Sequence, residues 1–546
     1  MASTRSTPAS TTAPLTESYV VGPSEPPVRD ITLGGLLAEV AGRVPDRLGI
    51  VEGVPDESAR RRWTYAEFHE QAERTARALL ATHQPGDRVA VWAPNIPEWL
   101  FLEFGCSLAG IVLVTVNPAY QAKELQYVLS QSRAQTLFVV DDFRGNPMRA
   151  TADQVQPDCP ELERIVSFAR WDEFLAEGAH DAELPEVAPD DPIMIQYTSG
   201  TTGFPKGALL RNVGLANNGA HTGMRMGVQD GGVFVIPMPL FHTGGSVCST
   251  LGAVGTASTI VLVPAFEPGL VLELFETYRA TAMLGVPTML IAMIEHPDFE
   301  TRDLTAFQAI CSGGSIVPAP LVRRLEQELD APFTIVFGQT ESSPVSSMTS
   351  PSDTIEDKAD TIGAPMPGVE IKIIDPDTGD TLPIGEVGEY CTRGYHVMRE
   401  YFEMPEQSAD AIDEDGWLHT GDLCAMDERG YCTVEGRLKD MIIRGGENIY
   451  PRELEDILFG HESVSEVAVI GLPDDKWGET VAAFVKPAPG QRVDKGALFA
   501  LMRENLAPHK TPKQWFSVEE FPMTGSGKIQ KFRLREQWQA GEWPEL

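Results

Sequence analysis

The stretch Tyr197-Thr-Ser-Gly-Thr-Thr-Gly-Phe-Pro-Lys-Gly207 indicates both the fold and the chemistry of this chain. It holds three glycines and four small hydroxyl side chains, and it directly follows the apolar run Ile193–Ile195. Glycines let backbone N–H groups approach an anion closely, hydroxyls donate further hydrogen bonds, and Lys206 adds a positive charge. The stretch therefore predicts a phosphate-binding loop after a strand. It is not a Walker A loop, because Gly207 stands where Ser or Thr must follow the lysine.

Strands and helices alternate on both sides of this loop. The apolar patterns predict helices at Tyr65–Thr82 and Pro97–Ala109. They predict strands at Leu48–Val51, Arg88–Trp92, Ile111–Val116, Thr136–Val140, Thr259–Val263, Ala282–Gly285 and Ala309–Ser312. Alternation of this kind is typical of an α/β fold with a largely parallel sheet. Strands that are apolar on both faces, such as Thr259–Val263, fit a sheet covered by helices.

The character of the sequence changes twice beyond this region. After about Glu370, short strands at Ile371–Ile374 and Gly388–Thr392 predict a small antiparallel subdomain, and the last segment from Leu438 alternates on its own. We therefore expect a disordered tail at 1–28, a large N-terminal domain of layered α/β subdomains plus a β-subdomain at 29–437, and a small α+β domain at 438–546. The acidic, proline-bearing stretch 181–192 is interpreted as a connector between lobes.

Composition limits the function classes. The 546-residue chain carries 79 acidic against 43 basic residues, a formal net charge of −36, which disfavours sequence-independent nucleic-acid binding. Its seven cysteines are widely spaced and form no C-x-x-C pair, which indicates reduced thiols in the cytoplasm. The longest apolar stretch, Trp99–Val116, contains Glu103 and fits a buried helix better than a membrane span.

Further motifs follow the glycine-rich loop in a fixed order. They are Pro237-Met-Pro-Leu-Phe-His-Thr-Gly244, Ser312-Gly-Gly-Ser315, Phe337-Gly-Gln-Thr-Glu341, Trp417-Leu-His-Thr-Gly-Asp422, Gly436-Arg-Leu-Lys-Asp-Met-Ile-Ile-Arg-Gly-Gly-Glu-Asn-Ile-Tyr-Pro451 and Pro522-Met-Thr-Gly-Ser-Gly-Lys-Ile529. From about residue 33 to its end, the chain resembles the adenylate-forming enzymes, and most of all the medium-chain fatty acyl-CoA synthetases. The resemblance implies that an acid is joined to the α-phosphate of ATP and then passed to a thiol, with a C-terminal domain that moves between the steps.

The resemblance also implies a nucleotide site. Glu341 corresponds to the carboxylate that holds Mg²⁺, and a single acid suffices because Mg²⁺ also binds phosphate oxygens. Asp422 corresponds to the acceptor for both ribose hydroxyls, which suits a carboxylate with two oxygens, and Arg437 is its basic companion. Phe337 keeps a ring for stacking on adenine where relatives usually have Tyr. The remaining ATP-binding candidates are Thr198, Ser199, Gly200, Thr201, Thr202, Gly203, Lys206, Gly313, Gly314, Ser315, Gly338, Gln339 and Thr340.

Two lysines are expected to serve the two half-reactions. Lys528 lies in a glycine-rich loop near the C-terminus, and its compact ammonium can balance charge between carboxylate and α-phosphate. Lys439 corresponds to the hinge about which the small domain rotates. Gly445 and Gly446 correspond to the lining of the tunnel for the pantetheine arm of coenzyme A, where a side chain would obstruct.

The acyl pocket is expected at small or apolar residues together with a histidine that places the carboxylate. Its candidates are His242, Gly245, Val247, Gly338 and Val345. The region carries no Lys or Arg, which favours an uncharged tail, and Ser246 stands where some long-chain members have a gating Trp. Glu400 replaces a glycine that is common before Tyr401 in relatives, and the sequence offers no reason for it.

The sequence therefore predicts an enzyme with ATP, Mg²⁺ and coenzyme A as cofactors, acting on a medium-chain fatty acid. Three alternatives stay open at this point. They are an aryl or cinnamate-type acid–CoA ligase, an adenylating enzyme that serves a carrier protein or a non-thiol acceptor, and a non-catalytic nucleotide-binding relative. The presence of Lys528, Glu341 and Asp422 together argues against the last. Oligomeric state does not follow from the sequence.

Overall fold

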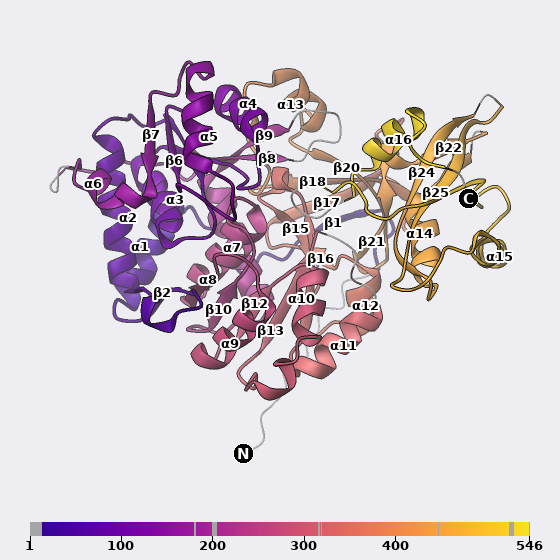
Figure 1. Ribbon diagram of the computed structural model, residues 1–546, viewed down its shortest axis with the longest axis horizontal. Coiled ribbons are helices and arrows are strands. Elements are labelled where there is room, and N and C mark those ends of the chain that lie inside the picture. Colours follow the sequence, from indigo (N-terminus) through magenta and orange to yellow (C-terminus); the bar gives the residue numbers. More distant parts are fainter. Residues whose placement is uncertain are drawn as a thin grey trace.

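A computed structural model describes residues 14–178, 182–198, 205–314, 317, 319–445, 447–474, 476–523, 529–544 and 546. These residues form four β-sheets with helices packed against them, and the last sheet stands apart on one side of the molecule (Figure 1). The helices are α1 (Leu33–Arg43), α2 (Tyr65–Leu80), α3 (Pro97–Ala109), α4 (Ala122–Ser132), α5 (Met148–Val155), α6 (Trp171–Leu175), α7 (Asn212–Arg225), α8 (Gly252–Gly255), α9 (Pro268–Tyr278), α10 (Pro287–Ile294), α11 (Ala319–Leu329), α12 (Ile355–Asp360), α13 (Pro405–Ala411), α14 (Pro451–Phe459), α15 (Lys495–Asn505) and α16 (Lys531–Gln539). None of the helices in the described ranges is long and apolar enough to cross a bilayer.

The first sheet has seven strands, and parallel strands form its centre. In spatial order they are β19 (Glu400–Tyr401), β9 (Lys206–Arg211), β8 (Pro192–Thr198), β5 (Val112–Thr115), β4 (Arg88–Trp92), β6 (Thr136–Val139) and β7 (Arg164–Ser167). Alternate residues of β4 enter two different apolar clusters, Val89 and Val91 in one and Ala90 and Trp92 in the other. Both faces of the sheet are therefore buried, as the apolar strands predict.

The second sheet repeats this construction. Its order is β16 (Ala364–Pro365), β15 (Val345–Met348), β14 (Phe333–Gly338), β13 (Ala309–Gly313), β12 (Ala282–Leu284), β10 (Val233–Ile236), β11 (Thr259–Leu262), β2 (Leu48–Glu52) and β3 (Arg62–Thr64). Strands β10 to β14 and β2 run parallel, and antiparallel strands close both edges. The predicted α/β class and parallel core are confirmed.

One connection differs from the prediction. The stretch 181–192 was expected to join two lobes, but the strands on either side of it, β7 and β8, belong to the same seven-stranded sheet. Its prolines and acids mark a surface connection within one subdomain rather than a boundary between two. The prediction of an interlobe connector is therefore wrong.

The third sheet is antiparallel, with the order β1 (Tyr19–Val21), β17 (Val369–Ile374), β18 (Val387–Gly394), β20 (Leu418–Met426) and β21 (Cys432–Arg437). It confirms the predicted β-subdomain. It also corrects the expected disordered tail at 1–28, because β1 pairs with β17 through Tyr19 and Lys372. Only residues 1–13 of that tail lie outside the described residues.

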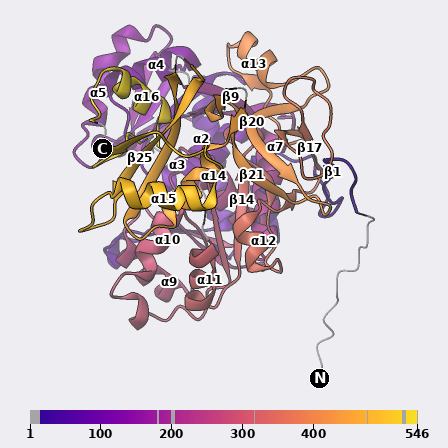
Figure 2. The ribbon, with the colours of Figure 1, turned by 90° about the vertical axis from the view of Figure 1, so that its right-hand side faces the viewer.

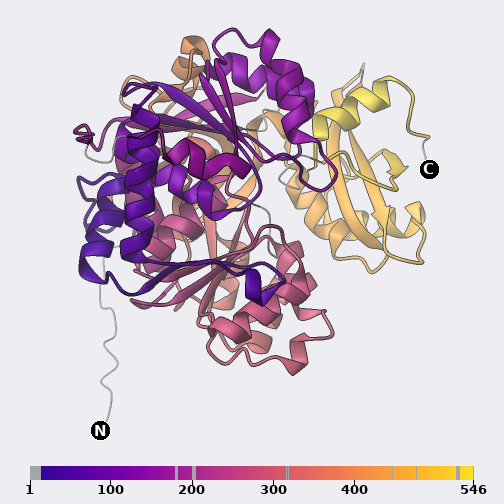
Figure 3. The ribbon, with the colours of Figure 1, turned by 60° about the vertical axis from the view of Figure 1, so that its left-hand side comes forward.

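The fourth sheet uses only residues after Leu438. It contains β23 (Glu447–Ile449), β22 (Ile442–Arg444), β25 (Gly478–Pro487) and β24 (Val464–Asp474), and β26 (Gln514–Ser517) pairs with β25. Figure 3 shows this orange-to-yellow part of the chain as a separate body beside the larger one, and Figure 2 shows it, with α14, α15 and α16, in front of the larger one. Its own apolar cluster includes Trp515 and Val469, so it has a core of its own.

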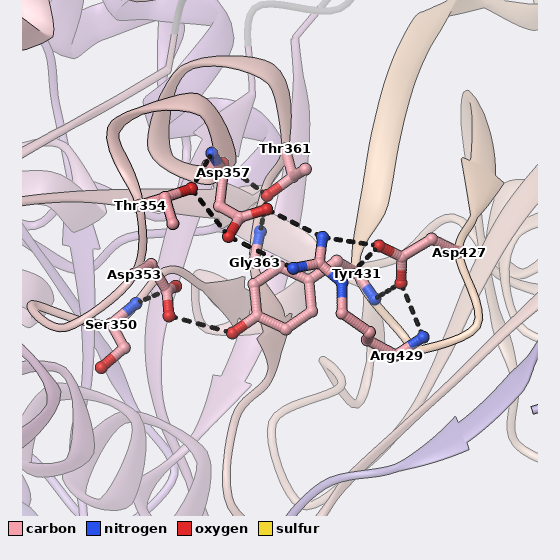
Figure 4. A network of polar contacts seen from close by, with 9 residues as sticks. All are labelled: Ser350, Asp353, Thr354, Asp357, Thr361, Gly363, Asp427, Arg429 and Tyr431. Carbon is pink, nitrogen blue, oxygen red and sulfur yellow. Dashed lines mark hydrogen bonds and ion pairs between the residues drawn. The ribbon is translucent and has the colours of Figure 1, made fainter. Parts of the chain in front are cut away.

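A polar network joins the turn of the β20–β21 hairpin to α12 and to the loop before it (Figure 4). Arg429, in the turn of the hairpin, contacts Asp427 beside it and Asp357 on α12, the latter at 2.8 Å between Nη2 and Oδ1. The Tyr431 hydroxyl donates to Asp353 at 3.1 Å. Hydrogen bonds from Arg429 are the main reason that the pKa of Asp357 lies below its usual value. Ion pairs of Arg429 thus hold the turn of the hairpin, at the opposite end from Arg437.

Candidate active site

The glycine-rich loop joins two antiparallel strands. Thr198 ends β8, Lys206 begins β9, and the two residues face each other in the ladder. The predicted anion-binding residues Ser199, Gly200, Thr201, Thr202 and Gly203 lie outside the described residues. At the exit of the loop, the Tyr127 hydroxyl donates to the carbonyl of Pro205 at 2.9 Å. The loop leads into a strand rather than a helix, which agrees with the sequence argument against a Walker A loop.

Tyr401 lies directly beside the exit of this loop. Strand β19 pairs with β9 through Tyr401 and Ala208, and the Phe402 N–H donates to the carbonyl of Gly207 at 2.8 Å. The Lys206 ammonium lies over the Tyr401 ring, 4.2 Å from its centroid. Glu400, its neighbour, is exposed on this edge strand, so a side chain at this position meets no obstruction.

Glu341 comes from a different segment and meets the same tyrosine. It lies in a short 3₁₀ turn, Thr340–Ser342, after β14 and Gln339, and it is 7% exposed. The Tyr401 hydroxyl donates to its Oε1 at 2.6 Å. Burial, followed by the charge of Glu341, raises the pKa of Tyr401 above its usual value. A buried carboxylate is costly unless a cation compensates its charge, and bound Mg²⁺ would do so.

The expected adenine site lies at the carboxyl ends of neighbouring parallel strands. Gly313 ends β13 opposite Val336 on β14, next to Phe337, and Gly314 follows with φ +76. The Phe337 ring packs edge-on against Tyr390, with centroids 5.3 Å apart. Ser315, the remaining candidate here, lies outside the described residues. Strand ends of parallel sheets are where α/β proteins bind ligands, which agrees with the predicted position.

Gly338 is required by geometry. Its φ is +151, and a Cβ placed on it would lie 1.9 Å from the carbonyl oxygen of Pro344. Any other residue would displace the turn that carries Glu341. The glycine therefore serves the backbone path between Phe337 and Glu341.

The expected ribose acceptor sits on the antiparallel sheet. Asp422 on β20 faces Arg437 on β21 in the ladder, and Nε of Arg437 lies 2.8 Å from Oδ1 of Asp422. Asp422 is 5% exposed, so its carboxylate is buried and held by the ion pair with Arg437. The structure thus pairs the two residues, and their roles at the ribose stay predictions.

A polar cluster next to Asp422 in the chain was missed by the sequence reasoning. His419 Nδ1 lies 2.8 Å from Oε2 of Glu389, and the Gly421 N–H donates to Oε1 of the same carboxylate at 3.0 Å. The hydrogen bond that His419 donates to the Glu389 carboxylate raises the pKa of His419 above its usual value. The Cys391 thiol lies 3.6 Å from His419 Nδ1. Through the Gly421 N–H, the cluster holds the backbone directly before Asp422 in the chain, where Gly421 has φ +69.

Lys439, the expected hinge residue, lies near the expected nucleotide-binding residues Asp422 and Lys206. It lies in the turn Leu438–Asp440, directly after Arg437 and β21. Burial lowers its pKa to about 8, and the positive charges of Arg437 and Lys206 contribute. The expected hinge lysine therefore lies near enough to Asp422, Arg437 and Lys206 for their charges to act on its pKa.

The C-terminal candidates are described only in part. Gly445 has φ +65, and its Cβ would lie 2.8 Å from the Trp477 ring. The ring is flanked by the Arg444 and Lys476 cations, at 5.5 Å and 4.7 Å from its centroid. Gly446 and Lys528 lie outside the described residues, and their roles stay predictions.

Three residues of the expected acyl pocket, His242, Gly245 and Val247, lie in or just before one π-helix. Residues Gly244–Leu251 form a π-helix that starts after His242, and its Val247 is fully buried. A Cβ on Gly245 would lie 2.3 Å from the Pro239 carbonyl oxygen, so glycine is needed there too. His242 Nδ1 accepts from the Gly244 N–H at 3.0 Å.

Two side-chain amides hold other residues of the expected acyl pocket in place. Asn218 on α7 donates to the Val345 carbonyl at 2.7 Å and accepts from its N–H at 3.0 Å. Gln196 on β8 donates to the Ser246 hydroxyl at 3.1 Å, so the position of the missing Trp is occupied by a hydrogen-bonded pair. Neither amide was singled out from the sequence, because their partners are far away along the chain.

Comparison with known proteins agrees with this arrangement. Residues 37–402 match the AMP-binding enzyme family, and residues 453–528 match the C-terminal domain of AMP-binding enzymes. YngI of Bacillus subtilis (strain 168), named as an acyl-CoA synthetase, is 40% identical over 92% of this chain and 96% of its own length. The mitochondrial medium-chain acyl-CoA ligase ACSF2 of Rattus norvegicus is 35% identical over 95% of this chain and 89% of its own. The structure of ATP-bound MatB from Rhodopseudomonas palustris aligns with a TM-score of 0.83 at 28% identity, covering 93% of this chain and 99% of that one.

The fold and the site define an adenylate-forming enzyme, and the chain belongs to the AMP-binding enzyme family. Within that family it is an acyl-CoA synthetase, an AMP-forming acid–thiol ligase.

Proposed function

We propose that this acyl-CoA synthetase activates a medium-chain fatty acid as its acyl-adenylate and transfers the acyl group to coenzyme A. The observation that carries the proposal is the meeting of two distant segments on Tyr401. The loop lysine, Lys206, lies over its ring, and the buried Glu341 accepts from its hydroxyl. A cation from the phosphate-binding loop and an acid suited to Mg²⁺ are thereby brought to one place.

In the first half-reaction, a carboxylate oxygen of the acid forms a bond to the α-phosphorus of ATP. The bond between the α-phosphorus and the bridging oxygen breaks, and pyrophosphate leaves. Both reactants are anionic, so positioning and charge neutralisation dominate. Residues 198–206 bind the outer phosphates, Asp422 and Arg437 hold the ribose, and Lys528 balances charge at the reacting oxygens. Mg²⁺ held by Glu341 neutralises phosphate charge when bound.

In the second half-reaction, the thiol sulfur of coenzyme A attacks the acyl carbon. The carbon–sulfur bond forms, the bond to the phosphate oxygen breaks, AMP leaves, and the thiol proton passes to solvent. Rotation of the domain after Lys439 brings Gly445 and Gly446 to the site, where the absence of side chains leaves room for the pantetheine arm. The exposed Trp477, which packs on Gly445, becomes part of that surface.

The acyl chain is proposed to lie among Gly245, Val247, Gly338 and Val345, with His242 at its carboxylate end. Their apolar or absent side chains favour an uncharged tail. The likeness to a medium-chain acyl-CoA ligase supports that chain length. A cytoplasmic location belongs to the same proposal and is supported by seven free, buried thiols.

Pyrophosphate release across a panel of acids tests the proposal. Acetate, octanoate, palmitate, cinnamate and benzoate would each be supplied with ATP and Mg²⁺, with and without coenzyme A. We expect octanoate to give the fastest release, with coenzyme A speeding turnover and octanoyl-CoA as product. Faster release with cinnamate or benzoate would assign the enzyme to aryl acids. Acid-dependent release that ignores coenzyme A would assign the acyl group to a carrier protein or a non-thiol acceptor.

A further inference from the structure

Tyr401 is buried, and its backbone is hydrogen-bonded to neighbouring elements. It is 5% exposed, its N–H donates to the Ser408 hydroxyl at 2.9 Å, and β19 pairs with β9 through it. The next residue is tied as well, because the Gln131 amide donates to the Phe402 carbonyl at 2.7 Å. The backbone on both sides of Tyr401 is therefore held by α13, by α4 and by β9, the strand that begins with Lys206.

The two contacts of Tyr401 use different parts of its side chain. The hydroxyl donates to Oε1 of Glu341, whereas the ring face lies under the Lys206 ammonium. An aromatic ring attracts a cation through its electron-rich face, and this attraction survives loss of the hydroxyl. Substitution can therefore remove one contact and keep the other.

The hydroxyl contact bears on the buried acid. Glu341 has one oxygen turned to Tyr401, and its backbone carbonyl accepts from the Met398 N–H at 2.8 Å. These two contacts of Glu341 come from the segment 398–401, which is itself paired with β9. Partners that orient a metal-binding side chain contribute about tenfold to a hundredfold in metal affinity.

We propose that Tyr401 is a positioning residue of the adenylation site, which orients Glu341 for the divalent cation through its hydroxyl and Lys206 for the phosphates through its ring. The inference rests on the proposed function, because it assumes that Glu341 and Lys206 meet Mg²⁺–ATP. It is separate from the family assignment, since neither the motifs nor the comparisons assign this tyrosine a role.

The test measures binding rather than turnover. Mn²⁺ affinity would be read by electron paramagnetic resonance at saturating non-hydrolysable ATP, and the affinity for metal-free nucleotide by titration calorimetry. Tyr401→Phe should weaken Mn²⁺ binding about tenfold and change metal-free nucleotide binding by less than about twofold. Tyr401→Leu should weaken both. Tyr65→Phe is the matched control, because Tyr65 is fully buried and its hydroxyl donates to the Ser258 carbonyl at 2.6 Å, in another part of the fold.

A double-mutant cycle separates positioning from general loss of structure. If Tyr401 acts through Glu341, Tyr401→Phe should have no further effect on Mn²⁺ binding in the Glu341→Gln background. The inference is overturned if Tyr401→Phe binds Mn²⁺ as the wild type does, or if its effect persists unchanged without the Glu341 carboxylate. A wild-type protein that binds no Mn²⁺–nucleotide would instead overturn the proposed function, and the inference with it.

Discussion

The guanidinium of Arg437 lies against the carboxylate of Asp422 across the last two strands of the antiparallel sheet, with Nε and Oδ1 2.8 Å apart. The acid is the buried partner, with an 8% exposed side chain against 39% for the arginine. Lys439 follows two residues later, where Asp422 is among the charges that act on it. The end of this hairpin therefore gathers the acid and two cations at one place.

Asp422→Asn should weaken ATP binding about tenfold or more. The amide replaces one acceptor oxygen by a donor NH₂ group and removes the negative charge, and a hydrogen bond to a charged group contributes about 1.5–3 kcal/mol. Calorimetric titration with ATP measures the effect. Asp427→Asn, in the turn of the same hairpin, is the control and should bind ATP as the wild type does. Equal losses in both variants would mean that the hairpin, and not the Asp422 carboxylate, matters.

Lys439 should make ATP binding depend on pH near 8. Its lowered pKa of about 8 leaves the ammonium charged at pH 7 and mostly neutral at pH 9. ATP affinity should therefore fall as pH rises through this range, measured by titration at pH 7 and 9. Lys439→Arg keeps its charge throughout and should bind with little change between the two pH values. A pH profile that is the same in the arginine variant would contradict this role for Lys439.

Glu389→Gln should destabilise the protein more at pH 6 than at pH 9. The pKa of His419 is raised from 6.5 in the folded state, chiefly by its hydrogen bond to Glu389. The stabilisation is complete below about 6.5 and is lost as pH rises through the raised folded value. We expect a difference of about 1 kcal/mol at pH 6, measured by urea unfolding. A gap between wild type and variant that widens toward pH 9 would have the opposite sign and refute the assignment.

Arg429→Gln should lower the free energy of unfolding by about 1 kcal/mol at pH 7, because Arg429 contacts both Asp427 and Asp357 (Figure 4). Arg170→Gln is the matched control, since Arg170 forms one pair with Glu173 in which both side chains are more than half exposed. Urea unfolding should show little change in the control. Since the pKa of Asp357 is depressed, the effect of Arg429 is present at neutral pH and is lost as pH falls through that depressed value. A control variant as unstable as Arg429→Gln would show that the network adds nothing.

Locally patterned elements were predictable from the sequence. Strand Arg88–Trp92 and helix Pro97–Ala109 were predicted with the bounds that the structure gives them. The strand is an unbroken apolar run after a charged residue, and the helix begins with Pro at its first position and ends before Gly110, whose φ is +66. Each signal is contained in a few neighbouring residues, which is why sequence reasoning succeeds there.

Long-range contacts were not predictable in this way. Strand β1 is three residues long and gains its order from pairing with Lys372, Ile371 and Glu370, so the tail around it reads as disordered. Tyr401 was noted only as the neighbour of Glu400, because its partners Glu341 and Lys206 lie far away along the chain. Glu389 and His419 were missed for the same reason. When the role of a residue depends on a partner far away in the sequence, the sequence around that residue carries no signal of the contact.

Exchange of labelled pyrophosphate into ATP, measured without coenzyme A, tests the central claim most directly. The wild type should show exchange that requires octanoate, because the acyl-adenylate forms before the thiol is needed. Lys528→Ala should lose this exchange and still convert supplied octanoyl-adenylate and coenzyme A into the thioester. Exchange in the wild type that needs no acid, or equal loss of both steps in Lys528→Ala, would contradict the account.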